Sequence, residues 1–146
     1  MNLKKAKCKM PKELSNKCHA IIHPFSAAAA AAGAIPIPIA DAIPISAAQV
    51  AMIMSLGKIF GLTIGSSVAE EIALIGLSIT GGRFIAANLL KLVPGFGSAV
   101  GAATAAAITE TIGWMAADDF YRISAGEEPE KIGKAMKDVY VIFKQI

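Results

Sequence analysis

Two apolar stretches, each interrupted by proline, constrain this chain more than any other feature. The first runs from Ser26 to Phe60 around Ile35-Pro36-Ile37-Pro38, and the second runs from Phe84 to Phe120 around Val93-Pro94-Gly95-Phe96-Gly97. A proline inside a helical run lacks the backbone N–H and clashes with the preceding turn, so the chain must fold back or kink there. The sequence therefore predicts paired helices whose hairpin tips contain Pro36, Pro38, Asp41, Pro44, Pro94, Gly95 and Gly97.

Local start and stop signals place the expected helices. No window alternates apolar and polar residues as a strand does, so an all-α fold is expected, with helical hairpins and a C-terminal amphipathic helix. Ser46 and Ser67 each open a capping box, a serine followed three residues later by Gln49 or Glu70. Glycines and prolines supply the remaining boundaries. The helices are expected over residues 24–33, 46–64, 67–80, 83–93, 98–120 and 129–146, and the fifth has room to span a bilayer.

Charge divides the chain into three expected parts: a basic flexible arm (1–20), an apolar helical-hairpin domain (21–123) and a C-terminal amphipathic helix (127–146). The net charge is +3, yet residues 1–23 alone carry six lysines and one acid, or +5. A lysine-rich arm beside apolar segments binds anionic lipid headgroups with about 1 kcal/mol per lysine. The lysines expected to face lipid are Lys4, Lys5, Lys7, Lys9, Lys12 and Lys17.

The apolar domain carries very little charge. Hydrophobic residues make up 55% of the chain and charged residues 17%, and only seven charged residues lie between Pro24 and Ala117. Such a surface suits lipid or a tight oligomer better than bulk water. The basic arm would stay on the cytoplasmic side. We therefore expect a membrane-associated protein, and we expect no nucleic-acid partner because the aromatic interleaving of such modules is missing.

Small residues recur at every fourth position in the long helix of each hairpin. Positions four apart share one helical face, so each set predicts a groove into which another helix packs closely. We interpret the sets as a helix-packing seam that supports self-association. The seam residues are Gly57, Gly61 and Gly65 in the first hairpin and Gly101, Ala105, Thr109 and Gly113 in the second, whose stripe extends from Gly97 to Ala117.

The candidate reactive side chains define no catalytic site. Cys8 and Cys18 are followed by His19 and His23, a donor set that suits zinc, but the Cys-x9-Cys spacing fits no common structural zinc site. A reduced arm without metal is therefore the favoured interpretation. Neither a nucleophile elbow nor a phosphate-binding loop is present. We expect no enzymatic activity and no cofactor.

Three further groups each have a structural and a functional interpretation. Asp41 and Glu110 either cap or support helices, or they line a pore or bind a cation of a partner. Trp114, Phe120 and Tyr121, beside Asp118 and Asp119, suit either a membrane headgroup layer or an ordinary helix end. The tail helix carries an apolar stripe, which packs onto the body or onto a partner. The stripe consists of Ile132, Met136, Val139, Phe143 and Ile146.

Several of these motifs together resemble an uncharacterised helical family associated with small bacterial GTPases of the Era/HSR type. The resemblance covers about Ile21 to Ile123, and a looser similarity extends to the helical regions of immunity-related GTPases. It rests on the first tip from Ile35 to Pro44 with Asp41, on Val93-Pro94-Gly95-Phe96-Gly97, on Gly113-Trp114 and on Asp118-Asp119-Phe120. It implies a membrane-associated helical module that acts with a GTPase on another chain.

The leading hypothesis is a non-enzymatic, membrane-associated helical module that self-associates as a homo-oligomer and acts with a GTPase partner. Two alternatives stay open. One is a soluble helical oligomer or GTPase adaptor whose apolar face is buried between subunits. The other is a pore-forming or toxin-like membrane peptide with Asp41 and Glu110 facing the lumen.

Overall fold

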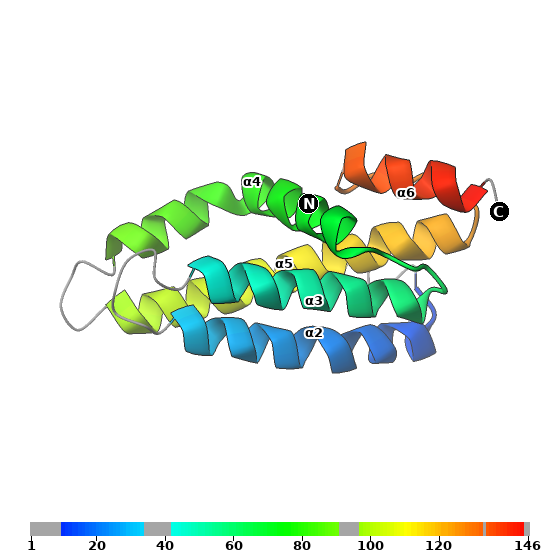
Figure 1. The fold of residues 1–146 in the computed structure, drawn as a ribbon. Helices are drawn as coiled ribbons and strands as arrows, with labels where there is room; N and C mark the ends of the chain where they lie inside the picture. The colour runs from blue at the N-terminus through cyan, green and yellow to red at the C-terminus, as the bar shows by residue number, and fades with distance from the viewer. Residues whose placement is uncertain (1–9, 34–41, 91–96, 133, 145–146) are drawn as a thin grey trace.

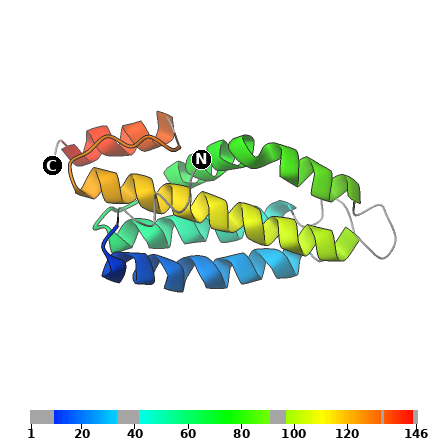
Figure 2. The same ribbon diagram turned by 180° about the vertical axis from the view of Figure 1, so that it is seen from behind.

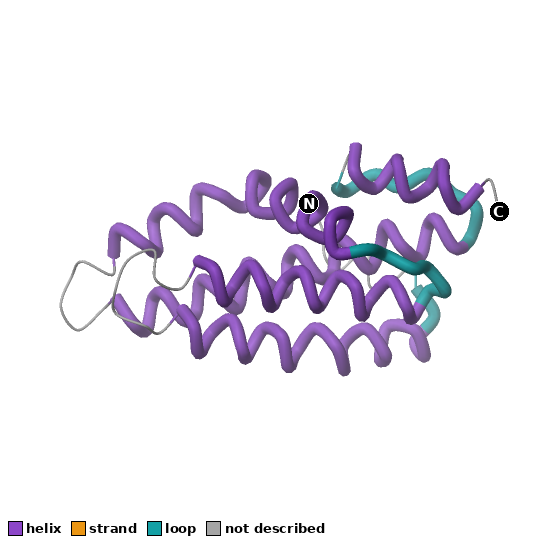
Figure 3. The backbone as a smooth tube through the Cα atoms, viewed as in Figure 1, coloured by secondary structure: helices purple, strands orange, loops and turns teal. Residues whose placement is uncertain are grey.

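The all-α prediction is confirmed over the part of the chain that the structure describes. The computed structural model describes the backbone of residues 10–33, 42–90, 97–132 and 134–144, and the side chains of 10–31, 47–79, 102–132 and 136–142. Within these ranges it contains five helices and no strand (Figure 3). They are α2 (Lys12–Gly33), α3 (Ala42–Ile59), α4 (Ser66–Leu90), α5 (Gly97–Ser124) and α6 (Lys134–Lys144).

Helices α2 to α5 form an antiparallel bundle, with α2 and α4 running in one direction and α3 and α5 in the other (Figures 1 and 2). Helix α2 packs along α3 and α5, and α4 packs along the same two helices from the other side. The end of α2, the start of α3, the end of α4 and the start of α5 lie together at one end of the bundle (Figure 1). Helix α6 packs against α4 and α5 toward the opposite end.

The bundle has one apolar core to which α2 to α6 all contribute. Its largest fully buried side chains come from α2, α3, α4 and α5. Many apolar residues of the sequence therefore pack against one another inside this bundle. Trp114 and Phe120, for which a headgroup position was one interpretation, are buried in this core. The fully buried set is Ile22, Met52, Ile53, Leu56, Ile72, Ile108, Ile112, Met115, Phe120 and Ile123, with Trp114 nearly as enclosed.

The first helix is longer than the sequence signals predict. Helix α2 begins at Lys12, and Pro24 lies in its interior where it was expected at the first turn. From Lys12 onward the segment is therefore a helix and not the expected flexible arm; residues 1–9 lie outside the described part. Cys18 and Ile22 are fully buried on one side of Pro24, and Ala29 is fully buried on the other. Packing on both sides of the proline outweighs the loss of one backbone hydrogen bond.

The glycine pair Gly81-Gly82 does not end a helix. Helix α4 continues through it to Leu90, so the two helices expected over 67–80 and 83–93 are one. Two interior glycines cost about 1 kcal/mol each relative to alanine. Packing of α4 against α5 compensates for this cost. The predicted start is confirmed to within one residue, since α4 begins at Ser66 and the capping box at Ser67.

Helix α3 differs from its prediction at both ends. It begins at Ala42, and Gln49, expected to cap its start, is instead fully buried in its interior. It ends at Ile59, five residues before the expected end. Gly61 has a φ of 75°, and the N–H groups of Gly61 and Leu62 donate to the carbonyls of Lys58 and Gly57 at 3.2 and 2.9 Å. This pair of bonds is the Schellman arrangement, which closes a helix at a left-handed glycine.

The final helix begins at Lys134 and not at Pro129. Gly126, with a φ of 83°, closes α5 through bonds from Gly126 N–H to Ile123 and from Glu127 N–H to Arg122. The chain then continues without regular secondary structure through residue 132. The expected packing of the tail stripe onto the body is confirmed for its described members, because Ile132, Met136 and Val139 are all buried.

The sequence predicted that the helix over 98–120 is long enough to span a bilayer. Among the helices of the described ranges, none combines the length and the apolar character that a membrane crossing requires.

Candidate functional site

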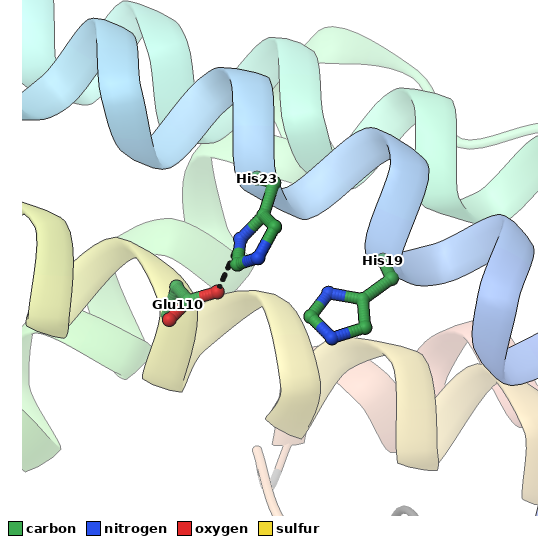
Figure 4. A group of neighbouring side chains, drawn as sticks. All are labelled: His19, His23 and Glu110. Atoms are coloured by element: carbon green, nitrogen blue, oxygen red, sulfur yellow. Dashed lines mark ion pairs between the residues drawn. The ribbon is translucent and has the colours of Figure 1, made fainter.

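Helices α2 and α5 bring three chemically versatile side chains together on the flank of the bundle. His19 and His23 are four residues apart on α2 and therefore project from one face of that helix. Glu110 projects toward them from α5, which packs along α2 (Figure 4). We call His19, His23 and Glu110 the histidine cluster. These are the only two histidines of the chain.

The histidine cluster is compact and partly open to solvent. Nδ1 of His23 lies 2.9 Å from Oε1 of Glu110, a hydrogen-bond distance that becomes an ion pair when the imidazole is protonated. The two imidazole centroids are 4.4 Å apart, and one possible ligand atom from each of the three residues lies within 4.8 Å of the other two. The side chains of His23 and Glu110 are 63% and 36% exposed. Solutes therefore reach the cluster from one side.

His19 forms the inner wall of the cluster. Its ring meets Trp114 edge to face, with centroids 5.3 Å apart and an angle of 83° between the rings. Trp114 is almost fully buried, so its contact fixes the orientation of the imidazole. Nδ1 of His19 is buried and has no hydrogen-bond partner among the described residues. A buried nitrogen without a partner is costly and marks a position with unused binding capacity.

A second polar group, which we call the buried charge cluster, lies at the end of α5. It comprises Asp118, Asp119, Arg122 and Lys131. Asp118 is fully buried, and its Oδ2 lies 3.2 Å from both Arg122 Nε and Lys131 Nζ. Arg122 also forms ion pairs with Glu127 and Glu130. Paired in this way, the carboxylate avoids the cost of an isolated buried charge.

Asp119 holds the segment between α5 and α6. Its two carboxylate oxygens accept hydrogen bonds from the backbone N–H groups of Glu130, Lys131 and Ile132 at 2.8 to 3.2 Å. Burial raises the pKa of the Asp119 carboxyl, and the neighbouring Asp118 charge adds to this, while the three backbone donors oppose it. These bonds attach residues 130–132, which precede α6, to the end of α5. The buried charge cluster is therefore a structural anchor.

The sequence interpretation placed Asp118 and Asp119 at a helix end or at an interface, and it missed their burial. The available signal was Arg122, four residues after Asp118, because this spacing places the two side chains together on a helix. Nothing in the sequence indicated that Glu110 would meet His19 and His23, since the contact joins two helices far apart along the chain.

The cysteines do not join the histidines. Cys18 is fully buried, its thiol lies 3.9 Å from the Met10 sulfur, and burial raises the pKa of this thiol to about 12. Among the described side chains, the group able to hold a metal ion contains the histidine cluster and not Cys18. Cys8 lies outside the described residues.

The packing seam is divided by the structure. In α5, Ala105, Thr109 and Gly113 are buried within the chain itself. A Cβ atom on Gly113 would lie 2.9 Å from Ile22 Cγ1 and 3.1 Å from Met52 Sδ, so α2 and α3 approach here as the stripe predicts. Gly101 belongs to α5, in a stretch whose side-chain surroundings lie outside the description.

The first-hairpin part of the seam does not form one helical face. A Cβ on Gly57 would meet Ile64 Cγ1 at 2.6 Å, so this glycine allows the chain after α3 to fold back. Gly61 and Gly65 lie beyond the end of α3, and neither has an atom within 4 Å of an added Cβ. The prediction of a continuous groove was wrong here because the Schellman turn ends α3 first.

The remaining predicted residues fall mainly outside the described part. Pro44 and Gly97 lie in the first turns of α3 and α5. Lys12 and Lys17 are exposed near the start of α2, where Lys17 pairs with Glu13 at 3.9 Å. The predicted residues outside the description are Pro36, Pro38, Asp41, Pro94, Gly95, Lys4, Lys5, Lys7 and Lys9.

The fold and these two polar clusters define an all-α bundle domain with an appended amphipathic helix. The model of the family described as "Domain of unknown function (DUF697)" matches residues 3–145. The chain therefore belongs to the DUF697 family. The matched range includes the residues, about Ile21 to Ile123, that carry the resemblance noted from the sequence. Comparisons with curated proteins and with solved structures give no match.

Proposed function

We propose that this chain is a non-enzymatic helical module that binds a membrane surface and self-associates, and that it acts with a GTPase partner. The observation that carries this proposal is the exposure of large aliphatic side chains on helices α4 and α6. Leu74 and Ile79 on α4 and Val141 and Ile142 on α6 are each more than half exposed. Scattered apolar side chains are common on protein surfaces, but here both pairs occur on helices that pack together.

Positive charge supports the lipid interpretation. Lys12 and Lys17 are exposed near the start of α2, and four more lysines precede them in the sequence. Each lysine near an anionic membrane contributes about 1 kcal/mol, and buried aliphatic side chains add to this attraction. We propose that shallow insertion of α4 or α6 side chains makes the contact. The lysines of α2, which packs on the other side of α3 and α5, add attraction to the anionic surface without lying in the same contact.

Self-association needs a different surface from the one that the sequence suggested. The described seam residues of α5 pack against α2 and α3 of the same chain and leave little room for a second copy. Among the described side chains, the exposed aliphatic residues of α4 and α6 are the remaining candidates. We therefore assign subunit contacts to these two helices.

A second candidate function is a soluble oligomer or GTPase adaptor that buries the same side chains between proteins. The observation that favours it is the mixed charge beside Val141 and Ile142, where Lys137 and Asp138 of opposite sign are exposed. A polar rim around apolar side chains is typical of protein interfaces. The proposed GTPase partner rests on the family resemblance in both cases. No described residue favours the pore-forming alternative, because Glu110 pairs with His23.

Vesicle flotation of the full chain tests the proposal. Vesicles of phosphatidylcholine alone are compared with vesicles that also contain phosphatidylserine, using Leu74→Ser, Ile142→Ser and the control Ala51→Ser at an exposed position on α3. We expect binding to the anionic vesicles, weakened at least about tenfold by each aliphatic substitution and unchanged by the control.

Light scattering after gel filtration, without lipid, is measured in parallel. Oligomers that dissociate in Ile142→Ser, combined with no vesicle binding, would support the adaptor function. If the chain is a monomer and binds neither vesicle type, the membrane proposal and the self-association proposal are both refuted.

A further inference from the structure

The donor atoms of the histidine cluster match the preferences of a particular class of metal ion. Two imidazoles spaced i, i+4 on one helix and one carboxylate from a neighbouring helix supply two nitrogen ligands and one oxygen ligand. Imidazole suits zinc, copper, nickel and iron, whereas magnesium and calcium prefer sets made of oxygen atoms alone. The chemistry therefore selects a divalent transition-metal ion.

The distances allow such a site after a small movement. Ligands in a tetrahedral zinc site, bound at about 2.0–2.1 Å, lie roughly 3.3 Å from one another. The ligand atoms of the histidine cluster are within 4.8 Å of each other, and one nitrogen–oxygen pair is already at 2.9 Å. We expect side-chain rotation to supply the remaining contraction. His23 and Glu110 are both partly exposed, so they are free to make it.

A hydrogen bond between His23 and Glu110 accounts for only part of this arrangement. It leaves His19 outside the pair, although Nδ1 of His19 is buried and has no described hydrogen-bond partner. Figure 4 shows both imidazoles turned toward the Glu110 carboxylate from α2. A bound cation would unite all three side chains, whereas the hydrogen bond uses two.

We propose that His19, His23 and Glu110 bind one divalent transition-metal ion of the Zn²⁺ class. The ion joins α2 to α5 across the flank of the bundle. Three protein ligands leave at least one coordination position for water or for a group from a partner, and the exposure of His23 and Glu110 places that position at the surface. This inference stands apart from the proposed membrane function, which uses side chains of α4 and α6 and the lysines near the start of α2.

The chain contains its own reporter for this site. Trp114 is the only tryptophan, and its ring lies 5.3 Å from that of His19. Titration of the full chain with Ni²⁺ should quench its fluorescence in a saturable manner, and calorimetry with Zn²⁺ should show one ion per chain. Mg²⁺ should produce neither effect. Circular dichroism of each variant without metal confirms that it has folded.

Substitutions at the two exposed ligands decide the proposal. His23→Ala and Glu110→Gln should each weaken Zn²⁺ binding at least about tenfold. Two controls should stay within about twofold of wild type: Glu71→Gln, an equivalent change at an exposed position on α4, and the double variant Cys8→Ser/Cys18→Ala.

Unchanged binding in both ligand variants would overturn the proposal. So would loss of binding in the cysteine variant with retention in His23→Ala, because the thiols would then hold the metal. Failure of Zn²⁺ to bind at millimolar concentration would also overturn it, and vesicle binding would be unaffected by that result.

Discussion

Replacing Asp119 with alanine should detach the segment between α5 and α6. Asp119 is fully buried, and its carboxylate accepts three backbone hydrogen bonds, from Glu130, Lys131 and Ile132. Alanine removes every acceptor and leaves these donors without a partner inside the chain. The Ile132 bond is buried and the other two are partly buried, so water replaces only some of them.

The expected loss of stability follows from these three bonds. A hydrogen bond to a charged group contributes about 1.5–3 kcal/mol, and partial replacement by water brings the gross loss for the three to about 3–5 kcal/mol. Burial raises the pKa of Asp119 above its ordinary value of 3.8, so the ionised carboxylate is held at a cost that alanine removes. We therefore expect a net destabilisation of about 2–3 kcal/mol.

Urea unfolding followed by circular dichroism measures this difference. With a slope of about 1–3 kcal/mol per molar urea, the midpoint should fall by about 1 M. The control Asp138→Ala, at an exposed position on α6, should change stability by less than about 0.5 kcal/mol. Hydrogen exchange of the three amides should accelerate only in Asp119→Ala. Equal stability of the two variants, with unchanged exchange, would refute the anchoring role.

Three further outcomes follow from the core. Burial raises the pKa of the Cys18 thiol from 9.0 to about 12, so at pH 8 its thiolate form is about a thousandfold less populated than that of a free thiol. In a Cys8→Ser variant, Cys18 should therefore react with thiol reagents at the rate of a free cysteine only when urea unfolds the chain. Gly113→Leu, which overfills the contact with α2 and α3, should lower the free energy of unfolding by about 1–3 kcal/mol; an unchanged melting temperature would contradict this. Thr109→Val should lower the free energy of unfolding by about 1–2 kcal/mol, because it removes the only described partner of the buried Gln49 amide. Adding Gln49→Leu should recover most of that loss in the same melting experiment.

The fold class was predictable because no window of the sequence alternates apolar and polar residues as a strand does. The start of α4 was also predicted to within one residue, because a local helix-start signal lies at Ser67 and Glu70. The errors occur where tertiary contacts override local signals. Pro24 and Gly81-Gly82 lie inside helices because neighbouring helices support them, and a sequence does not state which neighbours are present.

The candidate site was predictable only in part. His19 and His23 were identified as possible ligands, but they were paired with cysteines because those residues are close in sequence. The true neighbour is Glu110, which reaches them only when α5 packs against α2. In the same way, the burial of Asp118 and Asp119 depends on Lys131 and on the segment that follows α5.

The contact between Gln49 and Thr109 has a consequence for how α3 and α5 align lengthwise. Large buried side chains on both helices, Met52 and Leu56 on α3 and Ile108 and Ile112 on α5, already disfavour sliding one helix past the other by a turn of about 5.4 Å. Such a slide would move the Gln49 amide, which donates to Thr109 Oγ1 at 3.4 Å, opposite hydrocarbon. The polar pair therefore adds to the apolar packing in selecting one register, as buried asparagines do in coiled coils.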